Sequence, residues 1–520
     1  MSTNTRFWLP SVSDIFFLST FLFLAFSSGN NLLNDADTGY HIRAGEYMIK
    51  NLMVLRYDIF SYISPPLPWF AHEWLSEVIM ALVYRLSALT GVVIFFSILI
   101  ALASSLLFKF CRSLNHDIFL AVLFVLLATV SSTLHWLARP HIFSLVLTLI
   151  WYAILDQYQY KGQNRLYLLP PLMLLWANIH GGFIVGFLLI GIYLCGNTTV
   201  FLFGKEANRS AAKDKCNKLA AFTAICLIFS LFNPRGYSLL LFPFRMLSNQ
   251  WLLDHVSEFL SPNFHESLPY KYLLLLMVGI LALSRRAVNA IEVMLVLVFT
   301  YMSLYSARYI PLFAVIMTPI LLRQAESGLK SLDNRLVNFF WERSKNLELI
   351  DASTKGLVWP VLSVIGVCAL ALNGKIEFKF DGNKKPVAAV EFLKKEKIPG
   401  KMFNDDEFGD YLIYAAWPEY KVFFDGRSDM YGEAWGSQYL NVVTMRPGWE
   451  EVFEKNNFSW AFIGAEAPLS SVLLEKKKNW RLIYADTVAD IFVKQIPENH
   501  LLIDKYPDVK PIKIPASSLP

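Results

Sequence analysis

Two aspartates mark the part of the chain that could do chemistry. Asp35 and Asp37 lie between Asn34 and His41, directly after the first apolar run. Their carboxylates could bind a divalent cation such as Mg²⁺ or Mn²⁺, or take a proton from an incoming hydroxyl group. They could equally cap the helix that follows, because aspartate is favoured at helix starts. The residues alone leave both interpretations open.

Further polar side chains stand in the connections between apolar segments, where they could line a binding pocket. These candidates for substrate binding are His41, Glu73, Arg139, His141, Asn178, His180 and Arg308. An arginine could hold a phosphate with two parallel hydrogen bonds, since its charge is permanent and its fork planar. Each candidate also has a structural explanation: prolines break helices, Gly181-Gly182 makes a tight turn, and an arginine at a span end snorkels to the interface. Their expected convergence on one membrane face favours a pocket for an anionic, lipid-linked group beside a carboxylate.

A late Asp425-Gly426-Arg427 sequence follows a short apolar run, and Tyr431 lies close behind it. These residues could bind the acceptor of a reaction. The interpretation that we favour is a turn with a satisfied salt bridge, so Asp425 and Arg427 are kept only as secondary candidates for substrate binding.

The composition indicates which elements hold these residues. Of 520 residues, 55% are hydrophobic and only 17% charged, and 41 are phenylalanine. Apolar stretches approaching the ~20 residues that cross a bilayer recur through the first part of the chain. We therefore expect an α-helical membrane protein with about eleven transmembrane helices. The expected spans are 12–29, 91–110, 118–136, 140–156, 166–179, 182–203, 219–233, 268–284, 288–304, 308–323 and 357–373.

Arginine and lysine cluster in alternate connections, which gives one orientation for the whole chain. Clusters near Lys109, Lys161, 205–218, Arg285 and 323–355 all fall on the cytoplasmic side if the N-terminus is cytoplasmic. The apolar segment 74–89 does not fit as a crossing in this scheme. It is predicted to be a juxtamembrane helix on the outer face, although a short true span together with one miscounted later span would also fit. Residues 238–265 are predicted to be an outer interfacial segment.

The chain divides into two expected domains. Residues 1–373 form the transmembrane module, with its first outer loop at 30–90, and 374–520 form a soluble α/β domain outside the cytoplasm. Short apolar runs alternate with charged amphipathic stretches in this domain. The pattern predicts helices at 386–397, 408–416 and 469–478, strands at 401–404, 421–425 and 460–464, and a closing hairpin at 480–494.

Charge and cysteine usage narrow the possible partners. The net charge of +5 is scattered in short clusters, which fits loop retention better than nucleic-acid binding, so no nucleic-acid partner is expected. The five cysteines lie in or beside apolar spans without metal-type spacing, so neither a disulfide framework nor a zinc site is implied.

Taken together, the motifs resemble those of the membrane-embedded C-type glycosyltransferases (GT-C), which include protein mannosyltransferases, aminoarabinose transferases and oligosaccharyltransferases. The resemblance rests on the acidic segment after the first span, on 58–62 (Asp-Ile-Phe-Ser-Tyr), on Arg-Pro-His at 139–141 and Asn-Ile-His-Gly-Gly at 178–182, on Asn-Pro-Arg-Gly at 233–236, and on the late Asp-Gly-Arg. It covers most of the chain and is vague about substrate.

The resemblance implies a polyprenyl-phosphate-linked sugar as donor, transferred at the outer face of the bacterial cytoplasmic membrane to a glycan, lipid or protein. It puts Asp37 at the catalytic position and makes Asp35 a helper or metal ligand. Many relatives carry Asp-Glu where this chain has Asp37-Thr38, which leaves His41 and Glu73 as candidates for the second acidic role. Two other functions stay open: a transporter or flippase of lipid-linked saccharides, which would normally show internal repeats and midplane charges, and a non-catalytic scaffold for envelope assembly.

Overall fold

The computed structural model describes residues 8–114, 116–266, 268–330, 334–354 and 356–512. Lys355, at the end of the basic cluster 323–355 that entered the expected orientation, lies outside these residues. Contacts between the described residues cluster into two compact units, each of which is described by itself below. The first, the helical unit, takes in 8–29, Thr90–Ser248 and Leu253–Glu377, and the second, the mixed unit, takes in Asn30–Leu89, Asn249–Leu252 and 378–512.

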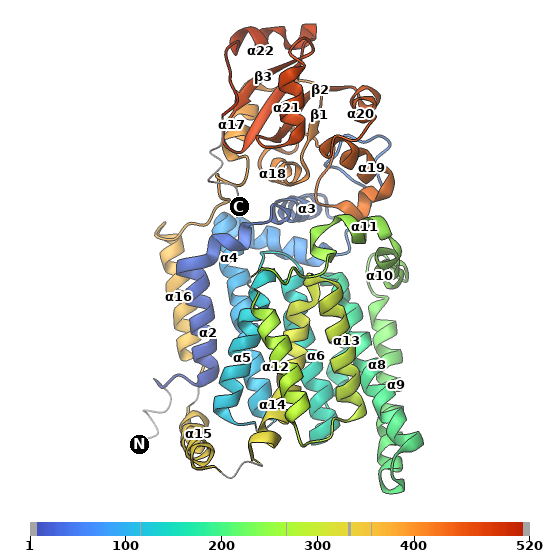
Figure 1. Ribbon diagram of the computed structural model, residues 1–520, viewed down its shortest axis with the longest axis vertical. Helices are drawn as coiled ribbons and strands as arrows, with labels where there is room; N and C mark the ends of the chain where they lie inside the picture. Colours follow the sequence, from blue (N-terminus) through green and yellow to red (C-terminus); the bar gives the residue numbers. More distant parts are fainter. Residues whose placement is uncertain (1–7, 115, 267, 331–333, 355, 513–520) are drawn as a thin grey trace. The chain divides into compact units, whose positions relative to one another are not determined.

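The helical unit is a bundle of apolar helices (Figure 1). Its main helices are α2 (Val12–Phe23), α5 (Ile118–Ser132), α6 (His141–Lys161), α7 (Leu169–Ile179), α8 (Ile184–Phe203), α9 (Glu206–Ser230), α10 (Ser238–Ser248), α12 (Pro269–Leu283), α13 (Ala290–Tyr305), α14 (Ile310–Lys330), α15 (Arg335–Ser353) and α16 (Val358–Leu372). The local sequence determines where several of these helices begin or end. Ser11 and Asn289 each form a reciprocal capping box, and Gly162 ends α6 in the left-handed conformation that glycine adopts without strain.

Six of the described helices are long and apolar enough to cross a membrane. They are Val12–Leu33, Trp74–Ser113, Ile118–His135, His141–Lys161, Gly181–Phe203 and Ala307–Lys330, and the bent pair α15 and α16 would make a seventh. The expected membrane-embedded helical protein agrees with this finding. Each of the eleven expected spans overlaps a helix, but several of these, such as α12 and α13, have only 15 or 16 residues. A count of eleven therefore stays a prediction.

Helix α4 (Trp74–Ser113) is broken near its middle. Ser87 and Ala88 have non-helical backbone angles, and Ala88 has a φ of 48°. The boundary between the two units falls directly after this break, at Leu89. The break separates 74–89 from the following span, as the sequence analysis expected, whereas a location of 74–89 at the membrane surface stays a prediction.

The mixed unit is built on a four-stranded sheet with the strand order β1-β2-β4-β3. Strand β1 (Lys401–Asn404) pairs in parallel with β2 (Phe458–Gly464), which pairs antiparallel with β4 (Ala489–Lys494), and β3 (Trp480–Ala485) forms the hairpin with β4. The helices of this unit are α3 (Asp37–Asn51), α17 (Val387–Glu396), α18 (Asp406–Ala416), α19 (Ser428–Val443), α20 (Trp449–Asn456), α21 (Pro468–Glu475) and α22 (His500–Lys505). Its core is largely aromatic, with Phe403, Phe423 and Phe458 packed together.

One strand predicted in this region is wrong. Residues 421–425 make only a single bridge, between Val422 and Ser61, and form no strand. The side chain of Asn404 takes the place of a neighbouring strand, because its amide oxygen accepts the N–H of Phe423 and its amide nitrogen donates to the carbonyl of Phe424. The helices α19, α20 and α22 were not predicted.

Candidate functional site

The two N-terminal aspartates have different structural roles. Asp35 accepts a hydrogen bond from the backbone N–H of Asp37 at 2.9 Å and so closes the turn that starts α3. The N-cap of α3 is Ala36, which makes no side-chain capping bond, so Asp35 stabilises the turn before the helix without being its cap. Asp37 is the first residue of α3 and is buried, with 7% of its surface exposed. A helix N-terminus favours a negative charge, so the site suits an ionised carboxylate.

A second buried carboxylate, Asp410 on α18, lies beside Asp37. Both oxygens of Asp410 accept the backbone N–H of Gly426 at 3.1 Å. A Cβ atom at residue 426 would clash with Oδ1 of Asp37 and would lie 2.9 Å from Oδ2 of Asp410. Only a glycine therefore lets this backbone lie against both carboxylates. Burial, together with the negative charges of Asp37 and Asp425, raises the pKa of Asp410 well above its ordinary value, which favours its protonated form.

Arg427 joins the first loop to the C-terminal part of the same unit. Its guanidinium donates to Asp425 at 2.8 and 2.6 Å and to Asp58 at 2.8 Å, and Tyr431 donates to Asp425 at 2.7 Å. Burial alone would raise the pKa of Asp58, but the charge of Arg427 and the hydrogen bonds from Ser61, Phe60 and Arg427 together outweigh burial and lower it. The geometry thus agrees with a satisfied salt bridge, the interpretation that we favoured from the sequence. One of its two carboxylates, Asp58, comes from the first loop and not from the Asp425-Gly426-Arg427 turn itself.

Aromatic rings enclose the Arg427 guanidinium. Its central carbon lies 4.6 Å from the ring centre of Trp69 and 5.0 Å from that of Phe60. Tyr40, on the helix that begins with Asp37, is 6.0 Å away. The rings exclude water and add cation–π attraction, so the ion pairs act in a medium of low dielectric constant, where removing one partner is costly.

His41 lies one helical turn beyond Asp37 and contacts two carboxylates. Its Nδ1 is 3.1 Å from Oε1 of Glu77, and its Nε2 is 3.6 Å from Oε2 of Glu73. Glu73 also lies 3.6 Å from His72. Burial would lower the pKa of His72, but the charge and hydrogen bond of Glu73, with smaller contributions from Asp429 and the Phe70 backbone, together raise it to about 9. The expected site residues Asp37, His41 and Glu73 therefore occur in one buried, charged region of the mixed unit.

The helical unit holds the two predicted phosphate-binding arginines. Arg139 and Arg308 both pair with Glu258, which lies in the 3-10 turn Ser257–Phe259. Arg308 approaches Oε2 of this carboxylate to 3.8 Å and stacks over Phe259. Burial would raise the pKa of Glu258, but the two arginines lower it to about 2. The arginines share one carboxylate, as they could share the oxygens of a phosphate group.

The remaining predicted residues of this unit make local hydrogen bonds. His141 contacts the carbonyl of His135 through Nε2 at 2.9 Å. Asn178 donates to the carbonyls of Leu174 and Phe232. Nδ1 of His180 accepts the N–H of Gly182. These contacts fit the structural explanation, in which the side chains hold helix ends and turns.

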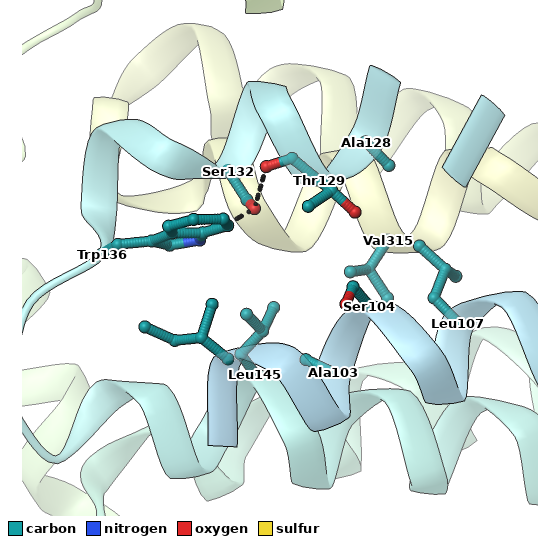
Figure 2. A pocket seen from close by; sticks show the side chains of 10 residues that line it. Ala103, Ser104, Leu107, Ala128, Thr129, Ser132, Trp136, Leu145 and Val315 are labelled. Atoms are coloured by element: carbon teal, nitrogen blue, oxygen red, sulfur yellow. Dashed lines mark hydrogen bonds between the residues drawn. The ribbon is translucent and has the colours of Figure 1, made fainter. Parts of the chain in front are cut away.

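A small pocket in the helical unit lies among apolar side chains. It has a volume of about 20 Å³, enough for a single water molecule, and its lining includes Ser104, Leu107 and Leu145. Figure 2 shows Trp136 at one side, where its ring nitrogen donates to Ser132. The pocket contains no charged side chain and none of the predicted site residues, so it is not the candidate site.

Three residues of the mixed unit were missed by the sequence analysis: Asp410, Glu77 and His72. A signal existed for Asp410, because an ionisable residue stands there among apolar ones in a helix that the sequence predicted. Glu258 of the helical unit was also missed, since it lies in a segment predicted only as interfacial.

The fold is compatible with a helical membrane protein, and the predicted site residues lie in two charged regions, one in each unit. Within the described residues, no group of three or more His, Cys, Asp and Glu side chains is arranged to hold a metal ion. A comparison with models of protein families finds no match, and no curated protein matches the sequence.

Proposed function

We propose that the protein is a glycosyltransferase that moves a sugar from a polyprenyl-phosphate-linked donor to a glycan, lipid or protein of the cell envelope. The observation that carries the proposal is the buried carboxylate of Asp37, held at a helix N-terminus beside Asp410 and the Gly426 backbone. The motif resemblance to GT-C enzymes supports the same function. The proposal includes eleven transmembrane helices, the bacterial cytoplasmic membrane, a cytoplasmic N-terminus and a C-terminal domain on the outer side.

The proposed reaction is an inverting transfer. Asp37 takes the proton of the acceptor hydroxyl, whose oxygen then bonds to the anomeric carbon of the sugar. The bond between that carbon and the lipid phosphate breaks, and the phosphate leaves as an anion. The permanent charge of Arg139 and Arg308, both in the helical unit, suits these residues to bind a phosphate group. If a divalent cation takes part, Asp35 and Asp37 are the residues that would hold it, and it would position the acceptor hydroxyl.

Asp410 complements Asp37 in this proposal. Two neighbouring carboxylates do not ionise equally, because the charge on one opposes the charge on the other. A protonated Asp410 leaves the negative charge on Asp37, which is the form that a general base needs. The environment of the pair thus separates the roles of two chemically identical groups.

The decisive experiment measures sugar transfer by the purified protein from a set of radiolabelled polyprenyl-phosphate sugars, with and without Mg²⁺ or Mn²⁺. Asp37→Asn should abolish transfer while preserving folding. Asp35→Asn is the matched control, because an asparagine oxygen can still accept the Asp37 N–H that starts α3. We expect this control to retain transfer. Normal transfer by Asp37→Asn would refute the role of Asp37, and donor binding without turnover in every variant would favour a transporter or a scaffold.

A further inference from the structure

In the sequence of the helical unit, helix α15 (Arg335–Ser353) lies between two apolar helices, α14 and α16. It begins a few residues after α14 ends at Lys330, and it ends a few residues before α16 begins at Val358. The chain bends by 67° between α15 and α16, so α15 does not continue the axis of the neighbouring apolar helix. Each end of α15 is therefore only a few residues along the chain from the end of an apolar helix.

One face of α15 packs against the rest of the helical unit. Ser344 donates a hydrogen bond to Asp117, and Glu348 forms an ion pair with Arg112 at 2.8 Å. Asp351 accepts the N–H of the first residue of α2 at 2.7 Å. The spacing of these residues, four and then three apart, places them on one side of the helix. This side is fixed by polar contacts.

A second face of α15 is apolar and exposed. Leu336, Phe339, Phe340 and Ile350 have 69%, 52%, 61% and 56% of their surfaces exposed. Phe339, Phe340 and Ile350 follow Leu336 by three, four and fourteen residues, so the four side chains form a stripe along one side of the helix. A continuous apolar stripe calls for an explanation, whereas scattered apolar surface residues do not. Arg343 lies within the stripe, exposed and stacked over Phe339 at 5.2 Å.

The exposed charges of α15 are mostly positive. Arg335, Arg343 and Lys345 are exposed cations, whereas Glu342 is the one exposed carboxylate among the residues that the structure describes in this helix. Aromatic residues beside arginines and lysines are typical of helices that lie in the headgroup region of a membrane. Anionic lipid headgroups attract such cations near the membrane surface.

We propose that α15 is an interfacial helix that binds the surface of an anionic membrane. Leu336, Phe339, Phe340 and Ile350 insert into the boundary between headgroups and acyl chains, and the cations contact lipid phosphates. Helix α15 lies at one end of the apolar bundle, where we place this boundary (Figure 1). This proposal is independent of the proposed sugar transfer.

Site-directed spin labelling of the full chain tests the proposal. Nitroxides are attached at Phe340→Cys or Lys345→Cys after the five native cysteines have been replaced by alanine, and the protein is placed in nanodiscs containing phosphatidylglycerol. Lys345 is the matched control, because it is exposed and lies about 140° around the helix from Phe340. We expect the ratio of oxygen to nickel-chelate accessibility to be several-fold higher at 340 than at 345.

Two results would overturn the proposal. Equal nickel-chelate accessibility at the two positions would place Phe340 in water, and an immobile label at 340 that neither reagent reaches would indicate a protein partner. If the cysteine-free background does not fold, a photo-crosslinking amino acid at 340 or 345 of the otherwise unchanged chain gives a second test. Crosslinks to radiolabelled phosphatidylglycerol should form at 340 and be several-fold weaker at 345, and equal yields would contradict the proposal.

Discussion

Replacing Gly426 by alanine should displace Asp37 while leaving the rest of the mixed unit folded. The added Cβ would lie 2.9 Å from Oδ2 of Asp410 and would clash with Oδ1 of Asp37. Because carbon–oxygen contacts normally start near ~3.3 Å, the carboxylates must retreat by on the order of 0.5 Å or more. Overpacking of this kind costs about 1–3 kcal/mol of stability, and a displacement of ~1 Å at a catalytic group costs about 100-fold in rate. We therefore expect transfer to fall by about 10- to 100-fold.

Gly382→Ala is the matched control for this substitution. The nearest atoms to a Cβ at 382 belong to Val387 at 3.9 Å, an ordinary van der Waals distance, so alanine fits there. Thermal unfolding in detergent and sugar transfer are measured for both variants.

A double-mutant cycle links the effect to the Asp37 carboxylate. In an Asp37→Ala background the clashing oxygen is absent, so the stability cost of Gly426→Ala should become smaller. This test needs no transfer activity. An unchanged cost in that background, or a Gly426→Ala protein as stable and active as Gly382→Ala, would refute the reasoning.

Three further predictions concern buried charges. Arg427→Ala leaves two buried carboxylates uncompensated and should cost about 3–5 kcal/mol in denaturant unfolding, more than Arg427→Lys. The pKa of Glu258 is lowered to about 2, so its ion pairs stabilise the folded protein at pH values above the ordinary pKa of a glutamate. The natural protein should therefore unfold at a higher temperature than Glu258→Gln at neutral pH. This difference should vanish as the pH falls towards 2. Burial raises the pKa of Asp405 to about 7, so protonation of this carboxyl group stabilises the folded protein, which is the reverse of the pH dependence of Glu258. The stability of the natural protein relative to Asp405→Asn should be highest in acid and should fall as the pH rises through about 7. A relative stability that does not change with pH would contradict either of the last two.

Local patterns of the sequence predicted much of the secondary structure. Apolar runs located the helices of the bundle because burial in lipid requires continuous apolar surface. The number of crossings could not be derived in the same way, since helices such as α12 are shorter than the thickness of a bilayer requires by themselves. Strand 421–425 was predicted from its apolar residues, but its hydrogen bonds go to the Asn404 side chain and to the first loop.

The charged site could be predicted only in part, because its partners are far apart in sequence. Asp58 and Arg427 are separated by 369 residues, and no periodic pattern connects them. The aspartate motif was recognisable because its residues are adjacent. The pairing of Arg139 and Arg308 with Glu258 could not be recognised from the sequence, because a carboxylate in an irregular segment has no sequence signature.

The turn at Asp425-Gly426-Arg427 shows that a structural role and a functional role can belong to the same residues. Its arginine is fully paired, which by itself supports a purely structural explanation. The same ion pairs, however, fix the backbone of Gly426 against the Asp37 carboxylate, and no side chain larger than hydrogen fits between them. A satisfied salt bridge next to a candidate catalytic group therefore does not argue against function, because holding that group in place requires such a rigid and fully paired support.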